Sequence, residues 1–430
     1  MAAARKTAAG AALAAAVGAA ALAGCAGGLF PGPDSSAGPS AREGTQDPRK
    51  GAAAPGGVVR LIGDGSTAYT GAQPHLSPPE RLKPGRRPPQ FVVFSWDGAG
   101  EDSQRLFSHF RKVAEENRAT MTYFLSGVYM LPLEKAGLYR PPRHSPGRSD
   151  IGFNEPRGIR DTVRELRAAW LEGNEIGTHF NGHFCGPNGV GAWSAEEWKE
   201  EIAQAKLFVQ SWKTNAGPRN AAPLPFDYGK ELIGARTPCL EGRPEFLKAA
   251  RELGFRYDSS GVSRQEWPAK TEGLWDLSMQ LVPVPGRAFE TLTMDYNFMV
   301  NQSGTTTQGD PAMRQYWGNQ MRDALLQGFH RAYNGNRAPL IIGNHFESWN
   351  GGVYMRAVEE TVKSVCNQPE VRCVSFRRLV DWLDAQDPKV LAKLRTLKVG
   401  QAPQPDWPAF LSAPSAPAPK GAPGSPGVKP

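Results

Sequence analysis

Short apolar segments alternate with amphipathic segments between residues 91 and 385, and this alternation constrains the fold more than any other feature. The apolar segments have the composition of buried strands, and they span residues 91–95, 120–125, 174–178, 232–236, 255–258, 274–284, 340–344 and 371–375. After the first of them, apolar side chains recur at helical spacing, at Leu106, Phe107, Phe110, Val113 and Ala114. Because continuous apolar strands that alternate with helices pair in parallel, the sequence predicts an α/β fold built from βαβ units.

Such units fit either an open sheet or a (β/α) barrel. Polar motif residues follow the predicted strands at their C-terminal ends, as Asp97 and His345 do. Active sites of (β/α) barrels lie at this end of the strands, so the placement favours a barrel. We therefore expect one large α/β domain over residues 90–386.

The first 25 residues have the pattern of an export signal. Arg5 and Lys6 precede an Ala-rich apolar stretch that is too short to span a membrane. The run Leu22-Ala23-Gly24-Cys25 resembles the lipobox of bacterial lipoproteins, in which the cysteine carries lipid. The resemblance implies an exported lipoprotein that Cys25 anchors to the outer face of a membrane. Ordinary secretion with an incidental Cys25 is the alternative.

Two segments outside the domain are rich in Gly, Pro, Ala and Ser. Residues 26–89 are predicted to be a flexible linker, and residues 387–430 a C-terminal extension with a disordered tail from residue 401. Such compositions bury too little apolar surface to fold. The formal net charge of +8 is modest and no nucleic-acid-binding motif accompanies it, so we expect no nucleic-acid partner. Nothing in the sequence specifies an oligomeric state.

Four cysteines remain after Cys25, and they are Cys185, Cys239, Cys366 and Cys373. In an exported protein an even number of cysteines indicates disulfides, and four allow three connectivities. Proximity to the motifs and to each other favours the pairs Cys185–Cys239 and Cys366–Cys373. In a rival interpretation, Cys185 joins His179 and His183 on a metal.

Two histidines four residues apart, His179 and His183, follow the third predicted strand. Together with Asp97 they would supply two imidazoles and one carboxylate, a common set of protein ligands for a catalytic zinc that leaves one position for water. Spacing alone does not establish such a site. The two histidines could share a loop by chance, and Asp97-Gly98 is also a turn signal.

The order of these motifs resembles that of the NodB-homology polysaccharide deacetylases, which remove acetyl groups from N-acetylated glycans such as chitin or peptidoglycan. The resemblance covers residues 90–385, and its motifs are Trp96-Asp97-Gly98, Gly173 to His179 with His183, Gly234 to Pro238, Leu247 to Ser260, Gly273 to Asp276 and Ile341 to His345. It implies a distorted (β/α) barrel, and an N-acetylated glycan or a cell-wall polysaccharide as partner.

The resemblance also implies roles for individual residues. Asp97, His179 and His183 would hold a divalent metal, zinc by preference, which polarises the acetamide carbonyl and activates water. His345 would protonate the leaving amine as general acid. Trp275 could form a sugar-facing wall, with Trp193 or Trp349 as neighbours, although core packing is the commoner fate of such residues.

The first motif differs from that of the family. Active members carry two adjacent aspartates, of which the first is the general base, oriented by the arginine at position 236, and the second binds metal. We expect Trp96 at the place of the first aspartate, and its indole cannot accept a proton from water. Arg236 would then need another carboxylate, because a buried guanidinium without an anion is costly.

Glu101 and Asp102 are the nearest candidates for a substitute base, although Asp102 could instead cap the following helix. Other carboxylates that could serve are Asp227, Asp276 and Asp295. Asp276 or Asp295 could instead orient His345.

Two functions follow from these motifs. The first is a metal-dependent glycan deacetylase at the cell envelope that uses His345 and a relocated carboxylate. The second is a catalytically impaired lipoprotein that binds cell-wall glycan, with Trp96 forming an apolar floor. A carboxylate within hydrogen-bond reach of both the metal-bound water and Arg236 would favour the enzyme, and an apolar floor made by Trp96 would favour the binder. A zinc peptidase is disfavoured, because no His-Glu-x-x-His motif occurs.

Overall fold

The computed structural model describes residues 60–218 and 220–412. The predicted signal peptide, Cys25 and the last residues of the predicted tail, 413–430, lie outside the described residues. Within the described ranges we find no helix with the length and hydropathy that a membrane span requires.

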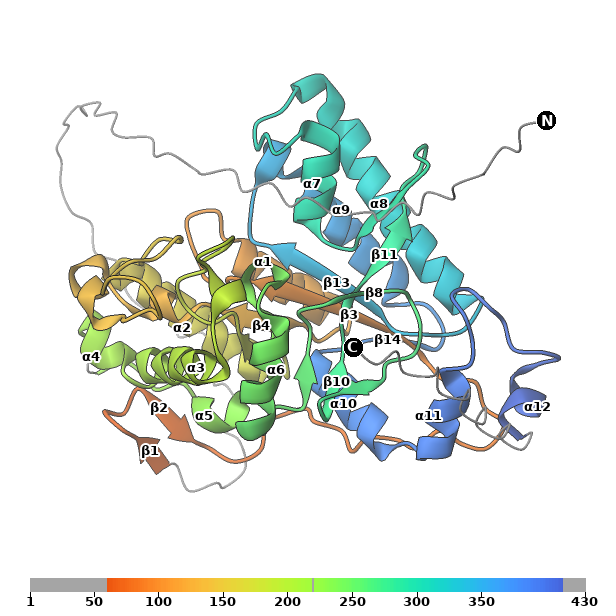
Figure 1. Ribbon diagram of the computed structural model, residues 1–430, viewed down its shortest axis with the longest axis horizontal. Helices are drawn as coiled ribbons and strands as arrows, with labels where there is room; N and C mark the ends of the chain where they lie inside the picture. The colour runs from red at the N-terminus through yellow and green to blue at the C-terminus, as the bar shows by residue number, and fades with distance from the viewer. Residues whose placement is uncertain (1–59, 219, 413–430) are drawn as a thin grey trace, which may run out of the picture. The chain divides into compact units, whose positions relative to one another are not determined.

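A nine-stranded sheet occupies the centre of the domain (Figure 1). Its strands are β3 (Gln90–Asp97), β4 (Thr122–Leu125), β5 (Glu175–Thr178), β6 (Gly234–Ala235), β7 (Tyr257–Asp258), β9 (Lys270–Thr271), β10 (Leu274–Asp276), β13 (Leu340–His345) and β14 (Val371–Cys373). They run in the order β13-β3-β4-β5-β6-β7-β10-β9, and β14 pairs with the first residues of β3. All pairs are parallel except β10 with β9.

Among the described residues, the hydrogen-bonded path does not return from β9 to β13, so the sheet is a curled half-barrel. The predicted α/β class with a distorted (β/α) barrel is therefore confirmed. The predicted single strand over residues 274–284 is wrong in detail. Asp276 accepts a hydrogen bond from the backbone N–H of Ser278 at 3.2 Å, and the chain turns there out of β10 into β11 (Met279–Pro283). Strand β11 joins a separate three-stranded sheet with β8 (Val262–Ser263) and β12 (Glu290–Leu292).

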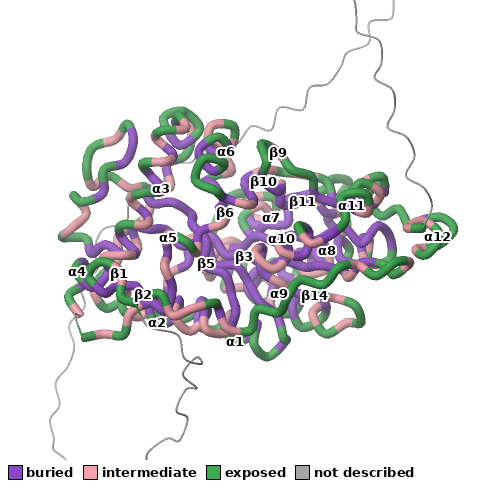
Figure 2. The backbone as a smooth tube through the Cα atoms, turned by 90° about the horizontal axis from the view of Figure 1, so that it is seen from below, coloured by how far each residue is buried: buried purple, intermediate pink, exposed green. Residues whose placement is uncertain are grey.

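Helices flank the sheet, and Figure 2 shows buried residues along its central strands, such as β3 and β5. The helices are α1 (Leu106–Glu116), α2 (Pro156–Leu171), α3 (Ala195–Gln210), α4 (Trp212–Ala216), α5 (Tyr228–Glu231), α6 (Arg243–Glu252), α7 (Asp295–Ser303), α8 (Arg314–Tyr333), α9 (Trp349–Val365) and α10 (Phe376–Ala385). Alternate residues of β3 face two different cores. Val92, Phe94 and Trp96 pack against helix residues, whereas Phe91 and Val93 pack inside the curl of the sheet.

Residues 60–89 differ from the predicted linker, because they fold against the domain. Strands β1 (Arg60–Ile62) and β2 (Thr67–Tyr69) pair antiparallel, and Ala68 donates a backbone hydrogen bond to Leu224 O at 2.9 Å. Gln73 Nε2 donates to Trp170 O at 2.9 Å. The composition of this segment did not predict these contacts, because they are made largely by backbone groups, which every residue has.

The C-terminal extension is also ordered as far as residue 412. Helix α11 (Pro388–Leu394) buries Leu391 and Leu394. Helix α12 (Trp407–Ser412) follows, and its apolar side chains pack on the inner core. Residues 401–412 therefore do not belong to a disordered tail, since enough apolar side chains contact the domain to hold them.

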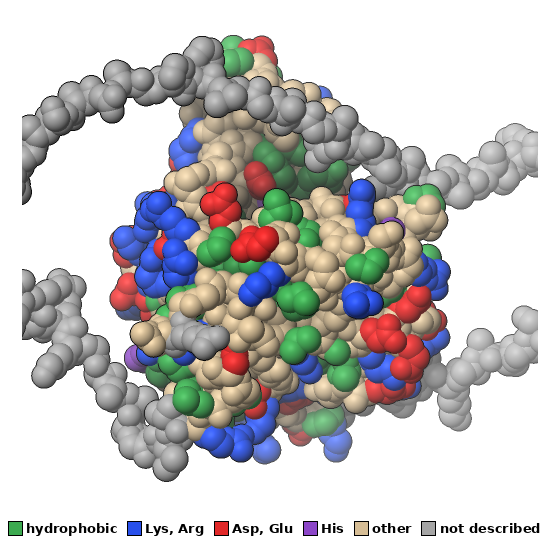
Figure 3. Space-filling model, turned by 90° about the vertical axis from the view of Figure 1, so that its left-hand side faces the viewer, with side chains coloured by type: hydrophobic (Ala, Val, Ile, Leu, Met, Phe, Trp, Pro, Cys, Tyr) green, Lys and Arg blue, Asp and Glu red, His purple; other side chains and the backbone are tan. Residues whose placement is uncertain are grey.

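Side chains of both charges lie interspersed on the face shown in Figure 3. Many of the charged side chains in the described residues are paired, and Arg143 with Glu197 is one such ion pair. The modest excess of positive charge is therefore not gathered into a continuous basic stripe on this face.

Candidate active site

Asp97 lies at the C-terminal end of β3, where its backbone is the register partner of His345 on β13. Arg236 follows β6 and donates from Nη1 to Asp97 Oδ1 at 2.9 Å. Its Nη2 donates to the hydroxyl oxygens of Ser95 and Ser259, each at 2.9 Å. Arg236 is fully buried and Asp97 is 4% exposed. The carboxylate that the sequence required for Arg236 is thus Asp97 itself.

Burial acts against ionisation of Asp97, but the positive charge of Arg236, together with His179 and His345, lowers the pKa of this carboxyl overall. Asp97 is therefore a carboxylate at neutral pH. A buried, ionised and oriented carboxylate at the open end of the strands can accept a hydrogen bond or a proton.

Trp96 does not stand in the site, which corrects the expectation drawn from the first motif. Its indole is fully buried among the helices, stacked on Phe346 at 4.6 Å between ring centroids and packed against Phe110 at 4.2 Å. Successive residues of a strand point to opposite faces, so Trp96 and Asp97 cannot both face the site. Trp96 therefore neither removes the base nor forms an apolar floor.

His179 and His183 lie in the loop after β5, with ring centroids 5.1 Å apart. His179 Nδ1 donates to Arg236 O at 2.9 Å, and its Nε2 is buried without a hydrogen-bond partner in the described structure. His183 Nδ1 faces Cys185 Sγ at 3.6 Å. Burial lowers the pKa of both rings, that of His183 to about 3. Both imidazoles are therefore neutral, the form that binds metals.

Asp295, at the start of α7, orients His345. Its Oδ1 accepts a hydrogen bond from His345 Nδ1 and its Oδ2 one from the His345 backbone N–H, both at 2.8 Å. Burial opposes protonation of the imidazole, but the fully buried Asp295 and then Asp97 raise the pKa of His345 to about 9. His345 is thus protonated at neutral pH, with Nε2 left to donate a proton.

Asp295→Asn should lower the pKa of His345 from about 9 to about 6.5 or below. The variant removes the negative charge of Asp295, which is the main influence that raises this pKa against the effect of burial. The pKa of His345 is higher in the folded protein than in the unfolded chain, so protonation of this ring stabilises the folded state. The stabilisation is fully present below about pH 6.5 and is lost as the pH rises through about 9. NMR titration of the imidazole carbons in the wild type and the variant measures both values. A wild-type His345 that titrates below pH 7 would contradict the assignment.

The proposed substitute bases lie elsewhere. Glu101 is 4% exposed and accepts a hydrogen bond from Ser108 N at 3.1 Å, so it caps helix α1. Asp102 is exposed and accepts from Gln104 N at 2.8 Å, which closes a turn before that helix. Both carboxylates serve the local backbone, and Arg236 has its anion in Asp97, so the base role assigned to them is corrected.

The other candidate carboxylates also have structural partners. Asp227 accepts from Gly229 N at 3.1 Å and caps α5. Asp276 pairs with Arg243 at 2.7 Å. Of the two residues considered for orienting His345, the structure therefore places Asp295 there and not Asp276.

Trp275 does not face the site either. It is 4% exposed, packs in the inner core and donates from Nε1 to Asp384 Oδ1 at 2.8 Å. Trp193 is also buried, against Trp198. Trp349 alone of the three tryptophans lies beside the site, with its ring 5.4 Å from that of His345.

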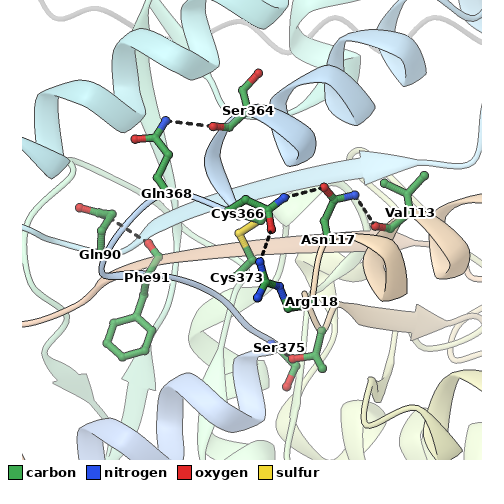
Figure 4. Close-up of a disulfide and its surroundings, with 12 residues drawn as sticks. Gln90, Phe91, Val113, Asn117, Arg118, Ser364, Cys366, Gln368, Cys373 and Ser375 are labelled. Atoms are coloured by element: carbon green, nitrogen blue, oxygen red, sulfur yellow. Dashed lines mark hydrogen bonds between the residues drawn. A yellow bond between two sulfur atoms is a disulfide. The ribbon is translucent and has the colours of Figure 1, made fainter.

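Both predicted disulfides are formed, Cys185–Cys239 and Cys366–Cys373. The first joins the loop of the two histidines to the loop after Arg236. The second links the end of α9 to β14, in the surroundings that Figure 4 shows. Because Cys185 is bonded to Cys239, the rival interpretation of Cys185 as a metal ligand with His179 and His183 is not supported.

Replacing both Cys185 and Cys239 with serine should destabilise the protein by about 4 kcal/mol in the chain-entropy model, given a sequence separation of 54. Replacing Cys366 and Cys373, separated by 7, should cost about 2 kcal/mol by the same relation. Urea denaturation of the two double variants measures the difference. Equal losses, or a larger loss for the shorter loop, would contradict an entropic origin.

Two imidazoles of this site fit a divalent metal. His179 has a free, buried Nε2 whose partner nitrogen is fixed by the Arg236 carbonyl, the arrangement that metal-binding histidines use. The ring of His183 lies beside it and supplies the second imidazole. Neither ring carries a positive charge of its own at neutral pH.

The predicted carboxylate ligand fits less well. Among residues 60–218 and 220–412, only His183, Cys185 and Cys239 bring three ligand atoms within 4.8 Å of one another, and their sulfurs are joined in a disulfide. Asp97 is not gathered with the two histidines in this way, and it is held by Arg236. In this geometry Asp97 is the ion-pair partner of Arg236, and the unpartnered Nε2 of His179 is the group that is free to bind a cation.

A cavity of about 460 Å³ opens beside the histidine loop, lined by Phe184, Cys185, Gly189 and the loop 143–150. Another, of about 560 Å³, lies at the opposite end of the strands, around Phe91 and Cys373. Only the first adjoins the site.

Sequence reasoning missed the partners that build this site. Ser95 and Ser259 hold Arg236, and Asp295 was one of several equal candidates. The period-two alternation of β3 was a usable signal, because it places Ser95 and Asp97 on one face and Trp96 on the other. Ser259 and Asp295 carried no comparable signal, since they meet the site only through tertiary packing.

No protein-family model matches the chain. No curated protein matches it either.

Several solved structures overlap the chain in part. One is a Mycobacterium smegmatis protein described provisionally as a polysaccharide deacetylase, with 15% identity, a TM-score of 0.45 and coverage of 71% of this chain and 95% of that one. A CE4 family pseudoenzyme from Bacillus anthracis has 11% identity, a TM-score of 0.37 and coverage of 71% and 70%. A family 4 carbohydrate esterase from Streptomyces lividans, in complex with acetate, has 11% identity, a TM-score of 0.33 and coverage of 66% and 91%. At such scores the overlaps favour no particular activity, which has to be derived from the contacts of the site.

Proposed function

We propose that this chain hydrolyses the acetamide group of an N-acetylated glycan at the cell envelope. The observation that carries the proposal is a pair of oppositely charged groups on neighbouring strand ends. Asp97 is held ionised by Arg236, and His345 is held protonated by Asp295. Amide hydrolysis needs one group that takes a proton from water and one that gives a proton to the leaving nitrogen.

In the proposed reaction, the oxygen of a water molecule bonds to the acetamide carbon, and Asp97 takes a proton from that water. Arg236 keeps the carboxylate in place and ionised before the reaction begins. His345 donates its Nε2 proton to the amine as the carbon–nitrogen bond breaks, and acetate and a free amine result. Two groups whose environments push their pKa values apart are the signature of such a division of roles.

His179 and His183 would hold a divalent metal, for which we propose zinc. When bound, the metal supplies Lewis acidity toward the acetamide oxygen and the attacking water. The Arg236 carbonyl fixes the ring of His179, and the Cys185–Cys239 disulfide ties the loop of His183 to the loop after Arg236.

The cell-envelope location rests on the sequence pattern around Cys25. We propose that lipid on Cys25 anchors the protein to the outer face of the membrane, with cell-wall glycan as its substrate. Metabolic labelling with a fatty acid should mark the wild type and not Cys25→Ala. Equal labelling of both would contradict lipidation at this residue.

The decisive experiment is acetate release by the full chain, loaded with zinc, from N-acetylglucosamine oligomers. We expect release that is lost in His179→Ala and reduced on the order of 10²–10⁴-fold in His345→Ala. His109→Ala is the matched control, because His109 is exposed and pairs only with Glu359 on the surface. A folded, zinc-loaded wild type that releases no acetate would overturn the proposal. The non-catalytic glycan binder was inferred from Trp96, which lies outside the site, so no observation favours it.

A further inference from the structure

Two aromatic side chains on separate elements flank the imidazole of His345. Tyr296 is the second residue of α7, and Trp349 is the first residue of α9. Their ring centroids lie 6.0 Å apart at an angle of 65°. The His345 ring lies 5.4 Å from Trp349 and 6.4 Å from Tyr296. The two rings form an angled surface at the proton-donating side of the site, which we call the aromatic corner.

The aromatic corner is open to solvent. Tyr296 is 41% exposed, and Trp349 is half-buried. All other tryptophans of the chain are buried, apart from Trp407 on α12. An exposed tyrosine against a half-buried tryptophan contributes little to core packing, but together they offer apolar faces to a ligand.

Hydrogen bonds on both sides hold the backbone that carries the two rings of the aromatic corner. Asp295 Oδ1 accepts from Tyr296 N at 2.7 Å, so the residue that orients His345 also orients Tyr296. After Trp349, Asn350 is buried and donates from its backbone N–H to Thr307 O at 2.7 Å, while its Oδ1 accepts from Gly309 N at 2.7 Å. A surface fixed in this way loses little conformational entropy when a ligand binds.

The rim of the aromatic corner is acidic. Glu347 lies between His345 and Trp349 in the sequence and is exposed, as is Asp102. Ser348 Oγ donates a hydrogen bond to Gln104 Oε1, and Asp102 Oδ1 accepts one from Gln104 N at 2.8 Å, so the segments that carry the two carboxylates lie side by side. A ligand with a carboxylate beside Glu347 and Asp102 would meet like charges.

We infer that the aromatic corner binds a pyranose ring of the glycan next to the sugar that loses its acetyl group, and that the acidic rim selects glycans without carboxylates there. The inference rests on the proposed function, because it places the ring beside the proton donor of that reaction. The axial C–H face of a pyranose is apolar and packs on aromatic rings, whereas its hydroxyls remain in water. The substrate class is thus a neutral or amine-bearing N-acetylglucosamine polymer, and not one with uronic acids beside the cleaved group.

The test is a binding titration of the full, zinc-loaded chain. It carries Asp97→Asn, so that the oligomers keep their acetyl groups during the measurement. The probes are N-acetylglucosamine oligomers and hyaluronan oligomers of equal length, in which every second sugar carries a carboxylate. We expect the neutral oligomer to bind at least about tenfold tighter. Tyr296→Ala and Trp349→Ala should each weaken its binding about tenfold, Trp349→Phe should restore most of the loss, and Trp407→Ala should change nothing.

Glu347→Gln combined with Asp102→Asn should bring the affinity for hyaluronan oligomers up to within about threefold of the neutral ones. Unchanged affinity of folded Tyr296→Ala and Trp349→Ala variants would overturn the inference, as would hyaluronan that binds as tightly as the neutral oligomer. Binding is read without acetate release, so the two proposals fail separately. If the protein binds the neutral oligomer selectively but the wild type releases no acetate, only the proposed hydrolysis is contradicted. If both alanine variants release acetate with an unchanged KM, only the proposed role of the aromatic corner is contradicted.

Discussion

Asp97→Asn should retain the metal of the wild type and release acetate on the order of 10²–10⁴-fold more slowly. The variant keeps the shape of the side chain, and its amide oxygen can still accept the hydrogen bond of Arg236. It loses the negative charge that takes the proton from water. Because the two histidines, and not this carboxylate, have the contacts of metal ligands, the metal content should not change.

Elemental analysis of the purified variant, beside initial rates of acetate release, measures both properties. His179→Ala is the matched comparison, since it should lose the metal and the activity together. A variant Asp97→Asn that loses metal to the same extent would show that Asp97 is a ligand after all. A variant with wild-type activity would remove Asp97 from the reaction.

Arg236→Met should lower the free energy of unfolding by about 3–5 kcal/mol, because it leaves the buried carboxylate of Asp97 without its partner. The guanidinium is fully buried and gives hydrogen bonds to Asp97, Ser95 and Ser259, so several acceptors lose their donor at once. The pKa of Asp97 should rise, since the variant removes the charge and the hydrogen bond of Arg236, which oppose the effect of burial.

Urea denaturation measures the loss of stability, and Arg148→Ala provides the control. Arg148 is 63% exposed and pairs with Asp150 at 3.0 Å on the surface, so its removal should cost less than about 1 kcal/mol. Adding Asp97→Asn to Arg236→Met should recover part of the stability, because the uncompensated charge is removed. Additive losses in the double variant would show that the two residues do not stabilise each other.

The secondary structure was predictable where a segment is apolar throughout. Strand β3 and strand β13 were expected almost to the residue, since buried parallel strands have uninterrupted apolar runs. The segment 274–284 was expected as one strand, but a turn at Asp276 splits it between two sheets. A side chain that hydrogen-bonds to its own backbone leaves no mark on the apolar pattern.

Composition was a poor guide at the ends of the domain. Residues 60–89 and 401–412 resemble linkers in their Gly, Pro and Ser content, yet they are held by backbone hydrogen bonds and by a few apolar contacts. Whether such a segment is ordered depends on the surface against which it lies.

The sequence by itself determined the chemical groups of the candidate site and the order in which strands bring them to one end of the sheet. It determined both disulfides as the favoured pairs, and it showed that Arg236 needs an anion. These inferences rest on residue type, strand periodicity and the cost of a buried charge, which are local or general properties.

Only the tertiary structure decided which carboxylate meets which cation. It pairs Asp97 with Arg236, Asp295 with His345 and Asp276 with Arg243, although sequence distance favours none of these partners. It turns Trp96 into the helix layer and brings Tyr296 to Trp349. Ion pairing and packing depend on distances of a few ångströms between residues far apart in the chain, and the folded backbone alone sets those distances.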